Sequence, residues 1–286
     1  MPEHGLFDDE TRTDPAGGSV WTGRVHPSWN IGENPNGGYL LTLAVSAIRQ
    51  ACPQHPDPLS VTVHYLRPGM PGAECRIDVQ VLRTGRTLST VRASLVQEGT
   101  ARVEVLAAMG RMGEAAGATA DAGLGAGDGT EPEPALALPM PAVPGPEACT
   151  PRTGEVQGLD LAILKRLDIR LDPAEFRVGG AGRAQISGWI RFRDGREPDP
   201  LACLLFVDTF PPSVVGLLGD VGWVPTVELT VQLRARPAPG WMLGRFQTHD
   251  LREGRLIEDA ALWDSRGRLV AQARQLALVR RAERKA

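Results

Sequence analysis

The sequence predicts an α+β fold of two repeats, in each of which an antiparallel sheet wraps around one buried helix. The 286 residues leave room for two units of ordinary domain size. Each half holds one strongly apolar run of helical length and several runs in which apolar and polar residues alternate. Three turn landmarks of the first half recur in the second at a nearly constant spacing, which indicates a duplicated unit. The pairs are Arg67 and Arg236, Gly85 and Gly254, and Gly99 and Gly267.

The first half predicts one strand, one helix and then four further strands. The helix is expected over residues 39–51, because Asn36-Gly37-Gly38 precedes an apolar run and three prolines follow it. The strand segments alternate at period two, are rich in Val, Leu and Thr, and are separated by glycine-containing turns. They are expected at 20–25, 59–66, 75–82, 87–96 and 101–109.

The second half repeats this order around a helix that begins just after Asp199-Pro200. Asp caps helix N-termini and proline suits the first helical position, whereas Pro211-Pro212 ends the run. This places Asp208 near the C-terminal end of a helix that is apolar on all sides and therefore buried, where an unpaired carboxylate is costly. Strands are expected at 184–192, 226–235, 241–250, 256–264 and 269–279.

A segment rich in Ala, Gly and Pro separates the repeats. Residues 113–148 nearly lack large apolar side chains, so they bury too little surface to offset the entropy of ordering. We therefore divide the chain into an N-terminal repeat at 1–112, a linker at 113–148 and a C-terminal repeat at 149–286. The repeats are expected to pair through their sheets, with the linker outside, because each open sheet would otherwise expose an unpaired edge.

The composition indicates a globular protein without a charged binding surface. The formal net charge of -3 argues against a nucleic-acid partner. No apolar run reaches the roughly 18 residues that cross a bilayer, and residues 1–16 are polar and acidic, without the apolar core of a signal peptide. The four cysteines form no Cys-x-x-Cys pair, and the histidines show no metal-ligand spacing. We expect a cytoplasmic protein without metal, cofactor or membrane partner.

Six motifs taken together resemble one known family. They are 34–39 (NPNGGY), 64–69 (HYLRPG), 83–86 (RTGR), Asp208, 226–230 (TVELT) and 269–275 (LVAQARQ). The pattern resembles the acyl-CoA thioesterase II family, whose members have the double hotdog fold, and it covers nearly the whole chain outside the linker. Hotdog proteins also include dehydratases and acyl-binding proteins, so the fold alone does not fix the activity.

The resemblance implies hydrolysis of acyl-CoA thioesters without a covalent intermediate. In that family an Asp, a Thr and a Gln of the second repeat hold and activate a water molecule. The matching positions are Asp208, Thr226 and Gln275. Thr230 is an alternative to Thr226, because the strand holds one extra residue before the turn that follows it.

The chemistry of these side chains agrees with that assignment. Thioester hydrolysis needs an acceptor for the proton of water and donors for the developing oxyanion. Asp208 can accept the proton, and Thr226 and Gln275 can hold the water and polarise the carbonyl. Gly37 and Gly38 leave N–H groups exposed at a helix N-terminus, and we suggest the amides of Gly38 and Tyr39 as oxyanion donors.

Each candidate residue also has a purely structural interpretation. Asp208 could bond only to nearby backbone where the helix ends, and Gly37-Gly38 could serve only a tight turn or close packing. Gln275 could be the single polar residue on a packed face, and threonine is in any case common in strands.

We therefore expect a hydrolase that acts on acyl-CoA or, as second candidate, on an acyl-carrier-protein thioester. The rival class is a non-catalytic acyl-binding subunit, which would keep the acyl tunnel without needing the Asp–Thr–Gln set. A dehydratase would require a histidine base at a helix start; His26 lies before the first helix, but no histidine closely precedes or lies within the second. The sequence also lacks the Gly-x-Ser-x-Gly motif of a serine hydrolase. The sequence leaves open the acyl chain and whether a homo-oligomer forms.

Overall fold

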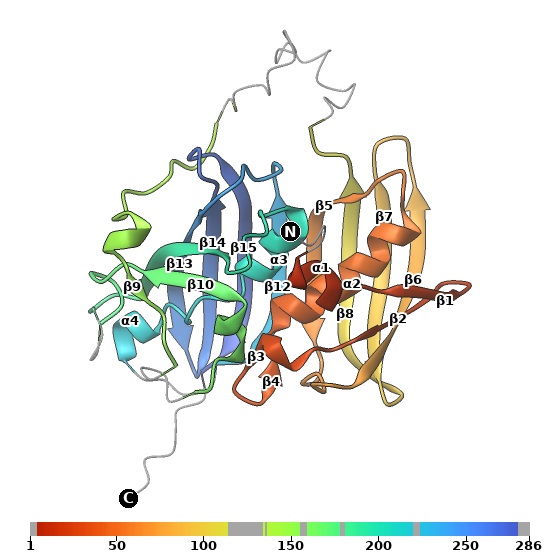
Figure 1. Cartoon of the computed structure of the whole chain (residues 1–286), viewed down its shortest axis with the longest axis horizontal. Helices are drawn as coiled ribbons and strands as arrows, with labels where there is room; N and C mark the ends of the chain where they lie inside the picture. Colours follow the sequence, from red (N-terminus) through yellow and green to blue (C-terminus); the bar gives the residue numbers. More distant parts are fainter. Residues whose placement is uncertain are drawn as a thin grey trace, which may run out of the picture.

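Thirteen strands of the described residues form one antiparallel sheet that runs through both halves of the chain (Figure 1). The structure, a computed structural model, describes residues 5–113, 134, 136–154, 159–177, 181–219 and 224–279. The strand order is β1-β2-β6-β7-β8-β5-β12-β15-β14-β13-β11-β10-β9. Helix α2 packs against strands β5, β6, β7 and β8 of its own half, α3 packs against β12 and β5 at the junction of the halves, and the two helices contact each other.

The first half has the predicted elements, each within three residues of its expected ends. Its helix is α2 (Gly37–Ala51), whose start is capped by Asn36, because the Asn36 side chain accepts the amide of Tyr39. The strands are β1 (Asp14–Gly17), β2 (Val20–Arg24), β5 (Asp57–Tyr65), β6 (Glu74–Thr84), β7 (Ser89–Gln97) and β8 (Thr100–Gly110). Among these, β1 was not predicted, nor were α1 (Leu6–Glu10), the 3-10 turn η1 (Pro27–Trp29) and the short pair β3 (Asn30–Ile31) and β4 (Asn34–Pro35).

The second half repeats the order of one helix and surrounding strands. The predicted elements are β11 (Gln185–Phe192), α3 (Pro200–Phe206), β12 (Thr226–Leu233), β13 (Met242–Arg252), β14 (Arg255–Trp263) and β15 (Leu269–Leu278). The sequence did not predict η2 (Pro146–Ala148), β9 (Thr150–Pro151), η4 (Ala162–Lys165), β10 (Leu167–Leu171) and α4 (Val215–Leu218). All of these are five residues or shorter, too short to show a periodic signal.

The second helix ends earlier than predicted. Asp199 caps it by accepting the amide of Ala202 at 2.8 Å, as the sequence indicates. The helix stops at Phe206, however, and Asp208 lies two residues beyond it. The Asp208 amide donates to Leu205 O, three residues back instead of four, so the chain tightens out of the α-helical pattern before the prolines are reached.

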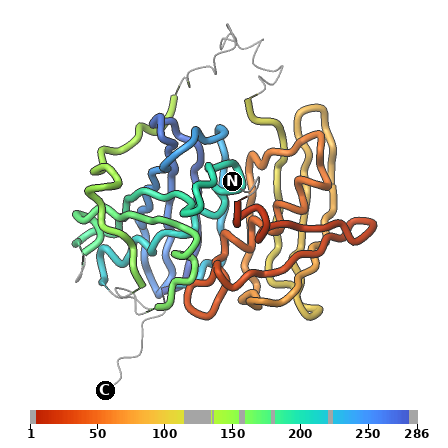
Figure 2. The backbone as a smooth tube through the Cα atoms, viewed as in Figure 1, coloured from red at the N-terminus to blue at the C-terminus, as the bar shows by residue number. Residues whose placement is uncertain are grey.

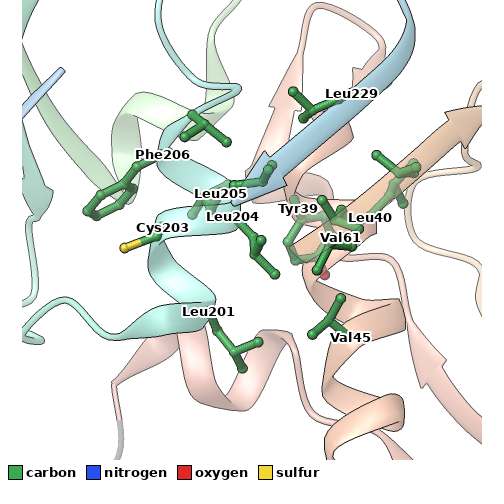
Figure 3. Packing of buried hydrophobic residues seen from close by; sticks show 14 of the residues in the cluster. Tyr39, Leu40, Val45, Val61, Leu201, Cys203, Leu204, Leu205, Phe206 and Leu229 are labelled. Atoms are coloured by element: carbon green, nitrogen blue, oxygen red, sulfur yellow. The ribbon is translucent and has the colours of Figure 1, made fainter. Parts of the chain in front are cut away.

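The two halves pair through their sheets, which confirms the prediction made from the repeat. β5 of the first half and β12 of the second run antiparallel, from His64 opposite Glu228 to Ser60 opposite Gln232. Figure 2 shows the halves side by side, and Figure 3 shows buried side chains of α3, including Leu204 and Leu205, beside those of α2. The start of α2 and the end of α3 are thereby brought together next to this seam.

The N-terminal segment, for which the sequence indicates only a polar and acidic character, forms ion pairs with the second repeat. Arg166 of the second repeat donates to Glu10 through Nε at 2.9 Å, and Trp29 Nε1 donates to the same carboxylate at 2.8 Å. Asp8 pairs with Arg196 at 2.7 Å. These partners are far apart in the sequence, so no local pattern could indicate them.

Part of the predicted linker is packed against the second repeat. Trp263 Nε1 donates to Leu138 O at 3.0 Å, and Trp189 Nε1 donates to Pro144 O at 2.7 Å. The expectation that 113–148 lies wholly outside the body is therefore wrong for these residues, because two tryptophan N–H groups need acceptors and find them there. Residues 114–133 of the linker lie outside the described residues. In the part of the chain that is described, no helix is long and apolar enough to cross a membrane.

Candidate active site

A cavity of about 420 Å³ lies at the junction of the two repeats. Its walls come from the start of α2 and the end of β5 in the first repeat, and from the turn after α3 and strands β12, β13, β14 and β15 in the second. The polar side chains that line it include Asn34, Asn36, Tyr65, Asp208, Thr226, Glu258 and Gln275, and its apolar wall includes Leu40, Phe210, Phe246, Leu256 and Leu278. The cavity combines an apolar pocket with a small polar cluster, which is the usual form of a small-molecule site.

The carboxylate of Asp208 faces the first turn of α2. Its Oδ2 accepts the backbone amide of Gly38 at 2.8 Å and the side-chain amide of Asn36 at 3.0 Å. Asn36 also donates to the backbone carbonyl of Asp208 at 2.7 Å, which fixes this turn against the helix. The second repeat therefore places its carboxylate at the positive end of the first repeat's helix.

The pKa of Asp208 is raised to about 6. Burial is the main cause, because it penalises the charged form, and the nearby Glu258 carboxylate raises the value further. The donors from Gly38 and Asn36, together with the nearby Thr226 hydroxyl, oppose this shift. Asp208 is therefore ionised at neutral pH, yet it is basic enough to accept a proton.

A β-bulge in β12 decides which threonine faces the cavity. Thr226 pairs with Ala277 of strand β15, and Glu228 pairs with the adjacent Leu276. Val227 is therefore an extra residue with no partner of its own on β15. An extra residue reverses the face to which the preceding residues point. Thr226 therefore lines the cavity, whereas Thr230 lies outside its lining and donates to Glu228 Oε1 at 2.6 Å. The structure brings Thr226, and not Thr230, to Asp208.

Gln275 connects Thr226 to a second carboxylate. The Thr226 hydroxyl donates to Gln275 Oε1 at 2.7 Å, and Gln275 Nε2 donates to Glu258 Oε1 at 2.6 Å. With its carbonyl and its amide both engaged, the side chain of Gln275 has one orientation. Gln275 is therefore more than a polar residue on a packed face: it belongs to a chain of hydrogen bonds that lines the cavity.

Glu258 is a site residue that the sequence reasoning missed. Its side chain is buried, and Oε2 accepts the backbone amide of Ser213 at 2.6 Å. Burial raises its pKa, and the donors from Ser213 and Gln275 oppose that shift. A signal was present: Glu258 occupies the same alternating face of β14 as Leu256 and Leu262, where a carboxylate is unexpected.

The two backbone amides suggested as oxyanion donors are already engaged. Gly38 N donates to Asp208, and Tyr39 N donates to Asn36 Oδ1 at 2.9 Å, so this part of the prediction is corrected. Gly38 also serves close packing, since a Cβ there would lie 2.8 Å from Leu204 O of α3. Gly37 lines the cavity, and no acceptor for its amide is found in the described part of the chain.

Tyr39 lies outside the cavity and supports the core. Its side chain is fully buried and stacks on Trp29, with ring centroids 5.4 Å apart. Its hydroxyl donates to Glu10 O at 2.6 Å and accepts the amide of His26 at 2.9 Å. The prediction that Tyr39 binds substrate is therefore also wrong, because its side chain lies in the core and not in the cavity lining. Among the described residues, no group of three or more His, Cys, Asp or Glu could hold a metal ion.

Comparison with known proteins shows the family and the fold of the chain. Residues 25–113 match the family model of the acyl-CoA thioesterase N-terminal domain, and residues 146–279 match that of the C-terminal domain. The chain belongs to the acyl-CoA thioesterase II-like family. Its fold is the double hotdog, as the sequence motifs imply.

Similar proteins extend over nearly the whole chain. An uncharacterized protein of Mycobacterium tuberculosis is 32% identical over 270 residues, which is 91% of each chain. The structure of a candidate thioesterase II from Thermobifida fusca is 33% identical, with a TM-score of 0.82 over 98% of this chain and 100% of that one. An acyl-CoA thioesterase II from Mycobacterium marinum is 19% identical, with a TM-score of 0.72 over 99% and 100% of the two chains, and shares the fold.

Proposed function

We propose that the protein hydrolyses acyl-CoA thioesters to the free acid and CoA, with a water molecule activated by Asp208. The observation that carries this proposal is a cavity in which Asp208 lies beside the hydrogen-bonded chain of Thr226, Gln275 and Glu258, next to an apolar wall. Family membership supports the reaction class. The apolar wall is suited to an acyl chain.

The hydrogen bonds of the polar chain support one way of holding the water. Thr226 spends its one proton on Gln275 Oε1, so its oxygen can only accept from water. Gln275 Nε2 has two hydrogens and gives one to Glu258, so the other can donate to the water oxygen. Asp208 accepts the second proton of the water, whose remaining lone pair then faces the thioester carbon.

The reaction then proceeds in two steps. Attack forms the new C–O bond, moves the π electrons onto the carbonyl oxygen and passes a proton from water to Asp208. Collapse restores the carbonyl, breaks the C–S bond and gives the departing thiolate the proton that Asp208 holds. The amide of Gly37, at the N-terminus of α2, is placed to stabilise the oxyanion between these steps.

The test is turnover of a panel of acyl-CoA thioesters of different chain length, followed with a thiol-reactive dye. An acylated carrier protein forms a second arm. We expect turnover by the wild type and a roughly 100-fold or greater loss in Asp208→Asn, which keeps the volume but removes the base. Folding should be retained, because the asparagine carbonyl can still accept the amide of Gly38.

Binding separates this proposal from the rival of a non-catalytic acyl-binding subunit. A non-hydrolysable acyl-CoA analogue should bind the wild type and Asp208→Asn with similar affinity, because the pocket is unchanged. Binding by the wild type without turnover of any thioester would favour the binding subunit. Turnover by Asp208→Asn within a few-fold of wild type would remove Asp208 from the mechanism.

A further inference from the structure

Tyr65 is a cavity residue that the mechanism above does not use. It is the last residue of β5 and continues the inward face of Val61 and Val63, both of which are buried. Its side chain lines the cavity beside Gly37 and Asp208. A Cβ built on Gly37 would lie 2.8 Å from Tyr65 Cζ and 2.9 Å from Asp208 Oδ2, so the phenol and the carboxylate flank the same point of α2.

The hydroxyl oxygen of Tyr65 is buried and has no hydrogen-bond partner among the residues that the structure describes. A buried hydroxyl without a partner costs free energy, and such groups in native proteins call for an explanation. The chain has only one other tyrosine, Tyr39, whose buried hydroxyl makes hydrogen bonds to the backbone of Glu10 and His26. The unpartnered hydroxyl of Tyr65 belongs to a side chain that lines the cavity.

The phenol stays protonated at any working pH. Burial raises the pKa of Tyr65 well above its ordinary value, and the carboxylates of Asp208 and Glu228 raise it further. The hydroxyl therefore always has a proton to donate, and a group with a strongly raised pKa does not transfer that proton readily. It is suited to stabilise charge on a ligand oxygen by a hydrogen bond.

We propose that Tyr65 donates a hydrogen bond to the carbonyl oxygen of the bound thioester and, with the Gly37 amide, forms the oxyanion hole. This rests on the proposed hydrolase function. When water attacks, the π electrons of the carbonyl move onto that oxygen, and the hydrogen bonds strengthen as the charge develops. Tyr65 keeps its proton throughout, and the proton from water goes to Asp208. The first repeat thus supplies both oxyanion donors, and the second supplies the water-activating set.

Tyr65→Phe tests the proposal because it removes only the hydroxyl. We expect kcat to fall by about 100-fold, as for other oxyanion donors, and KM to rise by no more than about tenfold, because the bound thioester loses the same hydrogen bond. Melting temperature should stay the same or rise, because an unsatisfied buried hydroxyl is removed. Tyr39→Phe is the matched control: it removes a satisfied hydroxyl away from the cavity, so it should lower the melting temperature and leave kcat near wild type. A kcat of Tyr65→Phe within three-fold of wild type overturns the proposal.

Two unreactive CoA derivatives test the contact independently of turnover. One is an S-alkyl thioether, which lacks the carbonyl, and the other is the matching ketone, in which CH2 replaces sulfur and the carbonyl remains. Tyr65→Phe should bind the ketone about tenfold more weakly than wild type does and the thioether equally well. Equal effects on both derivatives, or binding of neither by the wild type, contradict the proposal. If the wild type binds both but hydrolyses no thioester, the hydrolase function fails while this pair still reports on Tyr65.

Discussion

At the scale of single residues, the site holds two carboxylates with different surroundings. Both Asp208 and Glu258 have raised pKa values, chiefly because of burial. Glu258 is 3% exposed and accepts hydrogen bonds from Ser213 and Gln275, whereas Asp208 is only partly buried. We infer that Glu258 orients Gln275 and that Asp208 exchanges the proton with water.

The raised pKa of Asp208 predicts opposite pH dependences for activity and stability. Activity needs the carboxylate, so kcat/KM should fall with an acidic limb near pH 6, which belongs to the coupled Asp208 and Glu258 pair. The folded protein binds the Asp208 proton more tightly than the unfolded chain does. The stability from this group is therefore present in acid and is lost as pH rises from the ordinary value of 3.8 to about 6.

The measurement is kcat/KM and melting temperature from pH 4.5 to 8 for wild type and Asp208→Asn. The difference in melting temperature, variant minus wild type, should increase as pH rises toward 7, because the wild type then buries a charged Asp208 and the asparagine carries no charge. A flat rate profile between pH 5 and 7, or a difference in melting temperature that does not change with pH, would count against the assignment.

At the scale of the elements, the decisive feature is the bulge in β12. If the strand ran regularly through Val227, without the bulge, Thr226 would share a face with Glu228 and Thr230, and Gln275 would no longer accept a hydrogen bond from the Thr226 hydroxyl. The other element-level constraint is the approach of α2 to α3 at Gly38, where a side chain would meet the carbonyls of Leu204 and Leu205. The bulge and the close approach of the helices together place Thr226 and Asp208 side by side in the lining of the cavity.

Two threonines of this strand provide a matched pair of variants. Thr226→Val removes the hydroxyl that holds water, so we expect a 10- to 100-fold loss of kcat/KM, on the order of a catalytic hydrogen bond. Thr230→Val removes a hydroxyl that faces Glu228 and Thr62, so activity should stay within about two-fold of wild type. Circular dichroism checks the fold of both variants. The reverse ranking of the two activities would show that Thr230 is the water-holding residue.

At the scale of the whole molecule, neither repeat contains a complete site. Gly37, Asn36 and Tyr65 come from the first repeat, whereas Asp208, Thr226 and the chain to Glu258 come from the second. The seam between β5 and β12 holds the two sets in register, and the N-terminal ion pairs of Asp8 and Glu10 cross to the second repeat. We infer that activity depends on association of the repeats and not on the covalent link between them.

Limited proteolysis within the Ala, Gly and Pro-rich segment tests this inference. Its composition predicts cleavage there, while the continuous sheet predicts that the two fragments stay together. The cut protein should elute as one species from a sizing column, and its turnover should equal that of the intact chain. Separation of the fragments without denaturant would show that the seam alone does not hold the repeats.

The resemblance of the sequence motifs to a known family supplied Asp208, Thr226 and Gln275 as candidates, and the sequence by itself determined the duplicated architecture, most of the strands and both helix starts. These signals are local, because periodicity, caps and turn residues act over a few positions. Only the tertiary structure decided that the amides of Gly38 and Tyr39 are engaged, that the bulge turns Thr226 inward and that Glu258 and Tyr65 join the site. The contact between Gly38 and Asp208 spans 170 residues of sequence, and a hydrogen bond at that separation depends on how the repeats pack and leaves no trace in local pattern.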